Sequence, residues 1–186
     1  MNVKVKNLVY IAMFAAITAV LTLVTIPMPS GVPITLQTFA VALCGYMIGA
    51  LRGTAAIGVY IAVGAVGLPV FSGLRGGISV LTGATGGFIF GFLIFALLSG
   101  LGSRFFPKGR NAKTGILGIA AALALGIAGL FVCHLIGTLQ FGFVTGRNFP
   151  EAFLVASLPY IPKDIVSVVL AYILARTLRT RLKLID

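Results

Sequence analysis

The chain has 186 residues, of which 59% are hydrophobic and only 9% are charged. Soluble domains carry roughly 25% charged residues, so this composition excludes a soluble protein and indicates an integral membrane protein. The net charge of +11 does not indicate nucleic-acid binding, because the basic residues lie in short clusters between apolar runs, as the positive-inside rule expects. No stretch is long enough for a soluble domain, so we expect residues 1–186 to form one membrane domain.

Apolar segments of membrane-spanning length recur along the chain, since about 20 apolar residues cross the hydrocarbon core. Six segments qualify: residues 7–27, 35–51, 54–70, 83–102, 114–139 and 151–178. They predict an all-α bundle of six transmembrane helices. Only Leu51-Arg52-Gly53 separates the second and third segments, which predicts a tight helical hairpin, and Pro159 and Pro162 interrupt the last segment.

The basic residues are distributed unequally between the two sides of this predicted bundle. One side receives eleven of them: Lys4, Lys6, Arg52, Arg104, Lys108, Arg110, Lys113, Arg176, Arg179, Arg181 and Lys183. The other side receives Arg75, Arg147 and Lys163. Both termini are therefore predicted to be cytoplasmic. The external connections then hold most of the conformationally special residues, which predicts a pocket open to the outside.

Asp164 is the one acidic residue predicted at membrane depth, because Glu151 lies in a polar connection and Asp186 is the last residue. A carboxylate at a helix centre costs roughly 3 kcal/mol to insert, so its presence needs a reason. Pro162 is favoured in a first helical turn, which places Asp164 where free N–H groups and the helix dipole favour an anion. Two interpretations stay open: a terminal charge offset by Lys163, or a carboxylate that accepts hydrogen bonds from a ligand.

Two external segments carry further candidate ligand contacts. Arg75 is the only charge in a loop that continues with Gly76 and Gly77, and such a loop can approach a ligand through its backbone. Arg75 is either an ordinary loop cation or the partner of an anionic ligand group, whose carboxylate would fit the guanidinium fork. Gln37, at the start of the second span, is either an inter-helix hydrogen-bonding group or a ligand contact.

Alanines recur at small-xxx-small spacing on the first predicted span, in the pairs Ala12 with Ala16 and Ala15 with Ala19. This spacing lets helix backbones approach closely in a bilayer. It predicts either packing within this chain or an interface with another membrane subunit.

Residues 81–92 superficially resemble a phosphate-binding loop, but no Lys-Ser/Thr pair follows and the segment runs into an apolar helix. Gly87 and Gly91 are instead expected to let helices pack closely. The chain has no Walker A sequence, so we expect no ATP hydrolysis by this chain.

His134 is the only histidine and lies in the middle of a span, while Cys44 and Cys133 lie alone in apolar segments. These residues lack metal-ligand spacing, so no metal and no cofactor are expected. We expect His134 to form hydrogen bonds within the bundle. The scarcity of acids and histidine also argues against an enzyme.

Four segments together follow the pattern of a known family. They are residues 33–38, residues 67–71 with the later Gly76-Gly77, residues 81–92, and residues 159–164. In this order, over essentially the whole chain, they closely resemble the BioY family. The family usually has Pro-Thr-Gly-Gly-Tyr where this chain has Ala84-Thr85-Gly86-Gly87-Phe88. That departure does not touch the pair of Lys163 and Asp164.

BioY proteins are the biotin-specific substrate-binding (S) components of energy-coupling factor (ECF) transporters. The resemblance implies a multi-pass S component in the cell membrane that binds biotin with high affinity at its outward face for uptake. It also implies a transmembrane coupling (T) subunit and two ABC ATPases as partners, with Ala12, Ala15, Ala16 and Ala19 at the coupling-subunit interface.

Biotin has a ureido head with two N–H donors, a thioether ring and an apolar tail that ends in a carboxylate. We expect Asp164 to accept from the ureido N–H groups, Gln37 to make a further polar contact with the head, and Tyr160 and Phe71 to cover the rings.

For the tail carboxylate, Arg75 is the first choice. Lys163 and Asp164 project about 100° apart on a helix, so Lys163 is expected to neutralise Asp164 instead. The closest alternative function is a self-contained secondary transporter for a small vitamin-like substrate, in which Asp164 binds protons. A structural membrane protein whose glycine-rich helices mediate oligomers is a further alternative.

Overall fold

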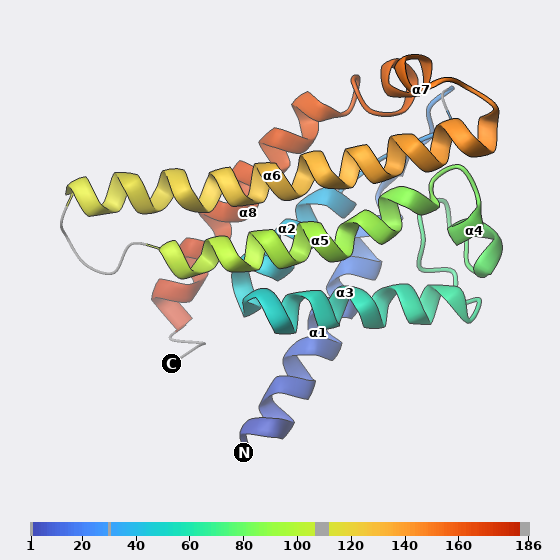
Figure 1. The fold of residues 1–186 in the computed structure, drawn as a ribbon. Coiled ribbons are helices and arrows are strands. Elements are labelled where there is room, and N and C mark those ends of the chain that lie inside the picture. The colour runs from blue at the N-terminus through green and yellow to red at the C-terminus, as the bar shows by residue number, and fades with distance from the viewer. Residues whose placement is uncertain (1, 30, 107–111, 183–186) are drawn as a thin grey trace.

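The computed structural model describes residues 2–29, 31–106 and 112–182, and it is almost entirely helical (Figure 1). The elements in chain order are α1 (Val3–Leu23), β1 (Thr25–Ile26), β2 (Ile34–Thr35), α2 (Gln37–Ile48), α3 (Ala50–Ala65), α4 (Ile78–Thr82), α5 (Gly86–Gly102), a 3₁₀ turn (Ser103–Phe105), α6 (Ala112–Thr145), α7 (Phe149–Ala156) and α8 (Ile161–Leu182). Lys108, Arg110 and Lys183, which the sequence places on the basic side, lie outside the described residues.

Three helical stretches in the described part of the chain are long and apolar enough to cross a membrane: α1, Gly86–Phe105 and Gly115–Thr145. The pair of α7 and α8 makes a fourth if it is taken as one span bent by 56°. The predicted spans 35–51 and 54–70 become helices of only 12 and 16 residues. The apolar character of α2 has another cause, because 11 of its residues are buried. A helix that is apolar all round is typical of a protein interior as well as of a bilayer.

The turn between α2 and α3 lies at Gly49, so the predicted position at Leu51-Arg52-Gly53 was wrong. Gly49 has a φ of 83°, in the left-handed region that favours glycine. Its N–H donates to the carbonyl of Gly45 at 2.9 Å, which ends α2. Leu51 and Arg52 already belong to the first turn of α3.

The predicted interruption of the last span is confirmed. Helix α7 ends at Ala156, and α8 begins at Ile161 after a short break. Pro162 is the second residue of α8, where a missing N–H removes no helical hydrogen bond. Asp164 lies in the first turn of α8, as expected, and its N–H donates to the carbonyl of Tyr160 at 2.9 Å.

The connections with irregular backbone gather at one end of the molecule. In Figure 1, α4 and α7 lie at the end opposite to the N- and C-termini. A two-residue antiparallel ladder of β1 and β2, with Thr25 paired to Thr35, links α1 to α2. The short strands and α4 were not predicted, because segments this short carry no periodic signal in the sequence.

The alanines of α1 do not share one environment. Ala12 and Ala16 are exposed. Ala15 is buried within the chain, and Ala19 packs against the core. In this arrangement the exposed surface of α1 therefore offers Ala12 and Ala16, but not Ala15, to a second protein.

The expected close packing at Gly87 and Gly91 is confirmed. A Cβ added to Gly87 would lie 2.6 Å from the carbonyl oxygen of Ile136, and one added to Gly91 would lie 2.7 Å from Cys133 Cα. Both neighbours are backbone atoms of α6. The absence of side chains at these two positions lets the backbones of α5 and α6 approach closely.

This packing predicts that Gly91→Ala destabilises the protein. Because backbone atoms of α6 must move, we expect a cost of about 1–3 kcal/mol and a fall in apparent Tm of about 3–10 °C in detergent. Gly58→Ala in α3 is the matched control, since a Cβ there meets nothing within 4 Å, and its Tm should stay the same or rise slightly. Equal effects of the two substitutions would contradict the assigned role of Gly91.

Candidate ligand-binding site

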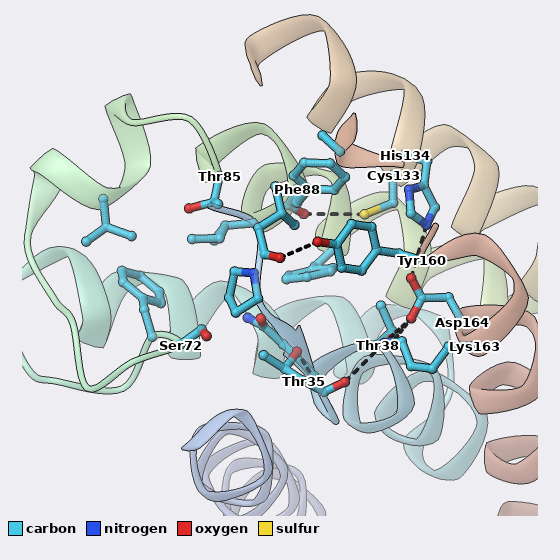
Figure 2. A pocket seen from close by; sticks show the side chains of 18 of the residues that line it. Thr35, Thr38, Ser72, Thr85, Phe88, Cys133, His134, Tyr160, Lys163 and Asp164 are labelled. Carbon is cyan, nitrogen blue, oxygen red and sulfur yellow. Dashed lines mark hydrogen bonds and ion pairs between the residues drawn. The ribbon is translucent and has the colours of Figure 1, made fainter. Parts of the chain in front are cut away.

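A cavity lies among α2, α5, α6 and α8 and is also lined by residues of the loops that precede α2 and α4 (Figure 2). It holds about 670 Å³ of space between atoms, including the part that opens to solvent. Val80, Phe88, Ile89 and Phe92 supply apolar walls. A few polar side chains converge among them, an arrangement typical of small-molecule sites.

The Asp164 carboxylate is the most buried charge of this cavity, with the residue only 3% exposed. Three side chains from three helices hold it. Thr38 of α2 donates to Oδ1 at 2.6 Å, Lys163 of α8 forms an ion pair with the same oxygen, and His134 Nε2 of α6 lies 3.1 Å from Oδ2 (Figure 2). A buried carboxylate needs such partners, since an unpaired one costs several kcal/mol.

Lys163 is engaged by protein groups at all of its donor positions. Besides the ion pair with Asp164, its Nζ donates to the Thr35 carbonyl at 3.1 Å and to Thr38 Oγ1 at 3.2 Å. An ammonium group has three N–H donors, so none is left over in this arrangement. Although neighbouring helical residues project in different directions, the long lysine side chain reaches back to the carboxylate.

His134 forms hydrogen bonds within the bundle, as expected, but its partners were not foreseen. Nδ1 lies 3.0 Å from Ser157 Oγ, and that oxygen lies 2.7 Å from Thr138 Oγ1. The imidazole and the Phe88 ring form a T-shaped pair with a centroid separation of 5.7 Å. His134 also lines the cavity. Its position as the only histidine was a signal, but nothing local in the sequence linked it to Asp164, 30 residues away.

Gln37 connects the cavity to the buried surface between α2 and α3. Its Nε2 donates to the Tyr60 hydroxyl at 2.8 Å, and Tyr60 in turn contacts the Val70 carbonyl at 3.3 Å and Thr22 Oγ1 at 3.5 Å. The interpretation of Gln37 as an inter-helix hydrogen-bonding residue is therefore confirmed, and Gln37 also lines the cavity.

The aromatic residues Phe71 and Tyr160 both line the cavity. Phe71 is buried and packs edge-to-face on Tyr60, with ring centroids 5.6 Å apart. The Tyr160 hydroxyl donates a short hydrogen bond to the Val32 carbonyl, which fixes the break between α7 and α8 against the segment before β2. Both rings are thus held in place by contacts with other parts of the chain.

Arg75 lines the cavity from an exposed position in the loop before α4. A backbone bridge with Phe71 and a hydrogen bond from Arg75 Nε to the Ser72 carbonyl at 3.0 Å hold the loop closed. The guanidinium has five N–H donors, and Nε uses one.

Gly76 and Gly77 are not among the lining residues of the cavity. A Cβ on Gly76 would lie 2.3 Å from the Leu68 carbonyl oxygen. Gly77 has a φ of 95°, and its N–H donates to the Gly64 carbonyl at 2.7 Å. In this structure the two glycines hold the loop of Arg75 against the end of α3.

The part of the chain that the structure describes contains no group of three His, Cys, Asp or Glu residues that would hold a metal ion. What the site offers is one buried carboxylate with fixed donors, a mostly apolar enclosure and an exposed guanidinium. Together with the membrane-length helices, these features are those of a multi-pass membrane protein whose helices enclose a cavity suited to a small molecule.

Comparison with known proteins assigns the chain to a family. The chain matches the BioY family over residues 1–184. It is 33% identical over 174 residues to the biotin transporter BioY of Thermotoga maritima, covering 94% of this chain and 96% of that protein. It is 35% identical over 175 residues to the biotin transporter BioY of Rhizobium etli, covering 92% and 91%. This chain belongs to the BioY family.

A solved structure agrees with the architecture described above. The crystal structure of the S-component for biotin from an ECF-type ABC transporter superposes with a TM-score of 0.81 at 27% identity. The match covers 97% of this chain and 95% of that one.

Proposed function

We propose that this chain binds biotin as the substrate-binding S component of an ECF-type ABC transporter and takes part in biotin uptake. The observation that carries the proposal is the similarity over nearly the full length to a solved biotin S-component, together with a cavity that pairs a buried carboxylate with an exposed arginine. The chain is a transport protein and not an enzyme. We further propose that its helices form one six-helix membrane domain with both termini in the cytoplasm.

The burial of the polar groups suggests how biotin is oriented in the cavity. The uncharged ureido head fits beside Asp164, which is 3% exposed. The tail carboxylate is charged and expensive to bury, so it fits beside the exposed Arg75. Lys163 is less suited to the tail, because its three donors already have acceptors.

The hydrogen bonds at Asp164 limit how many ligand donors it accepts. Oδ1 already takes Thr38 and Lys163, while Oδ2 takes His134 and keeps one acceptor position. We therefore infer that Asp164 accepts one ureido N–H rather than a parallel pair. The Gln37 side-chain oxygen is the candidate acceptor for the other N–H, since Gln37 donates to Tyr60 through Nε2.

Asp164→Asn tests this role directly. A hydrogen bond to a charged acceptor contributes about 1.5–3 kcal/mol, so we expect the Kd for biotin to rise about 10- to 100-fold. Calorimetry or binding of radiolabelled biotin to the purified chain measures the effect. Glu151→Gln is the control, because Glu151 is an exposed acid outside the cavity, and it should bind like the wild type. Unchanged affinity in a folded Asp164→Asn protein would contradict the assignment.

Arg75→Ala should weaken binding of biotin more than binding of an uncharged biotin amide, because only biotin presents a carboxylate to the guanidinium. We expect a loss of about tenfold for biotin and a clearly smaller one for the amide. Arg147→Ala, which removes another exposed external arginine, should change neither affinity. Equal losses for both ligands would show that Arg75 supports the loop and does not bind the tail.

The transmembrane coupling subunit and the two ABC ATPases are proposed as partners. The solved relative is described as part of an ECF-type ABC transporter, and the present chain has no Walker A sequence of its own. The exposed face of α1 with Ala12 and Ala16 suits close packing against another membrane helix.

This interface predicts that Ala12→Trp and Ala16→Trp reduce biotin uptake several-fold in cells that also express the coupling and ATPase subunits. Their biotin affinity as purified proteins should be unchanged, because neither residue lines the cavity. Ala124→Trp on the exposed face of α6 is the matched control and should leave uptake unchanged. If uptake is the same for all variants and does not require the added subunits, a self-contained transporter explains the protein better.

A further inference from the structure

Four buried side chains form a continuous hydrogen-bonded series that ends at the wall of the cavity. It runs from Thr138 to Ser157 (2.7 Å), then to His134 (3.0 Å) and then to Asp164 (3.1 Å). All four residues are between 0% and 4% exposed. Thr138 and His134 lie one turn apart on α6, Ser157 lies in the break after α7, and Asp164 lies on α8.

The chemistry of the groups sets the direction of this series at its cavity end. An ionised carboxylate only accepts hydrogen bonds, so His134 Nε2 carries a proton and donates to Asp164 whatever the charge of the ring. With a neutral ring, Nδ1 is an acceptor that Ser157 satisfies, and Ser157 accepts in turn from Thr138. Each donor then points toward Asp164, and both nitrogens of His134 are occupied, so the ring offers none to a ligand.

The position of His134 matters because the other two partners hold the same carboxylate oxygen. Thr38 and Lys163 both contact Oδ1. The terminal torsion of an aspartate is broad, so a partner on each oxygen restricts the orientation of the carboxylate more than contacts to Oδ1 alone. His134 fixes Oδ2, the oxygen that still has an acceptor position for a ligand.

We propose that His134, held by Ser157 and Thr138, is a positioning residue that orients Asp164 Oδ2 toward the ligand's N–H donor. This assignment rests on the proposed function of biotin binding. The hydroxyl groups of Ser157 and Thr138 then contribute to the affinity for biotin indirectly. They hold the imidazole, which donates to the carboxylate and not to biotin.

Two amide substitutions at position 134 separate positioning from simple packing. A glutamine places its Nε2 near the place of the histidine Nε2 and can donate to Asp164, whereas an asparagine reaches only as far as Nδ1. We expect His134→Asn to raise the Kd for biotin about tenfold or more, and His134→Gln to stay within about threefold of the wild type. Equal losses in the two variants would overturn the proposal.

A double-mutant cycle with Asp164→Asn tests whether His134 acts through Asp164. If it does, His134→Asn costs about tenfold in the wild type but less than about threefold in the Asp164→Asn background. The same factor in both backgrounds would overturn the proposal.

Ser157→Ala provides a milder variant should the His134 variants fail to fold, because it keeps the imidazole and the backbone hydrogen bonds. We expect a loss of about threefold in the wild type and none in the Asp164→Asn background. Ser99→Ala is the matched control, since Ser99 is a fully buried serine of α5 whose hydroxyl has no hydrogen-bond partner. An effect of Ser157→Ala no larger than that of Ser99→Ala contradicts the proposal.

If the wild-type protein binds no biotin, the proposed function itself fails. This result is distinct from failure of the positioning role, in which the wild type binds biotin and the variants do not differ as expected.

Discussion

A carboxylate buried among apolar helices imposes the main constraint on this protein. Asp164 is 3% exposed and is held by Thr38 from α2, His134 from α6 and its neighbour Lys163 on α8. Removing water from a charge costs several kcal/mol, and only close partners offset that cost. The relative positions of α2, α6 and α8 are therefore tied to one side chain. The cavity lies where these three helices meet, so the group that fixes the helices also lines the cavity.

The helices around the cavity are interrupted where the site needs irregular backbone. Helix α2 is short and buried, and the last span is broken between Ala156 and Ile161 with a bend of 56°. In a bilayer such breaks are tolerated where protein or a cavity covers the free backbone groups. Here two residues of the break make such contacts: the Tyr160 hydroxyl donates to the Val32 carbonyl, and Ser157 forms a hydrogen bond with His134. The same break thus supplies both an aromatic wall and the support of the buried carboxylate.

Six residues that line the cavity stood out in the sequence, because each belongs to an unusual local pattern. Asp164 is the acid predicted at membrane depth, with Lys163 beside it and prolines nearby. Arg75 is the only charge of a glycine-rich loop, and Gln37, Tyr160 and Phe71 lie in the motifs that resemble the BioY family. All six line the cavity. The contacts of His134 and Ser157 were missed, since they depend on how α6 crosses the α7–α8 break. Each of the six predicted segments overlaps a helix, but the turn at Gly49 lies before the predicted one, because an apolar sequence does not reveal which residue takes a positive φ.

The sequence by itself determined the class of protein, the helical segments, the break at the prolines and the family. These properties follow from local composition and from motifs read in order along the chain. Only the tertiary structure decided three other properties. Lys163 uses its three donors on protein groups, and Gly76 and Gly77 support a loop and do not line the cavity. Thr138, Ser157 and His134 form a hydrogen-bonded series that ends at Asp164. The reason is physical. A hydrogen bond about 3 Å long forms only if two helices cross at the right place. Residues far apart in the chain set that crossing together, so no single segment of the sequence contains the information.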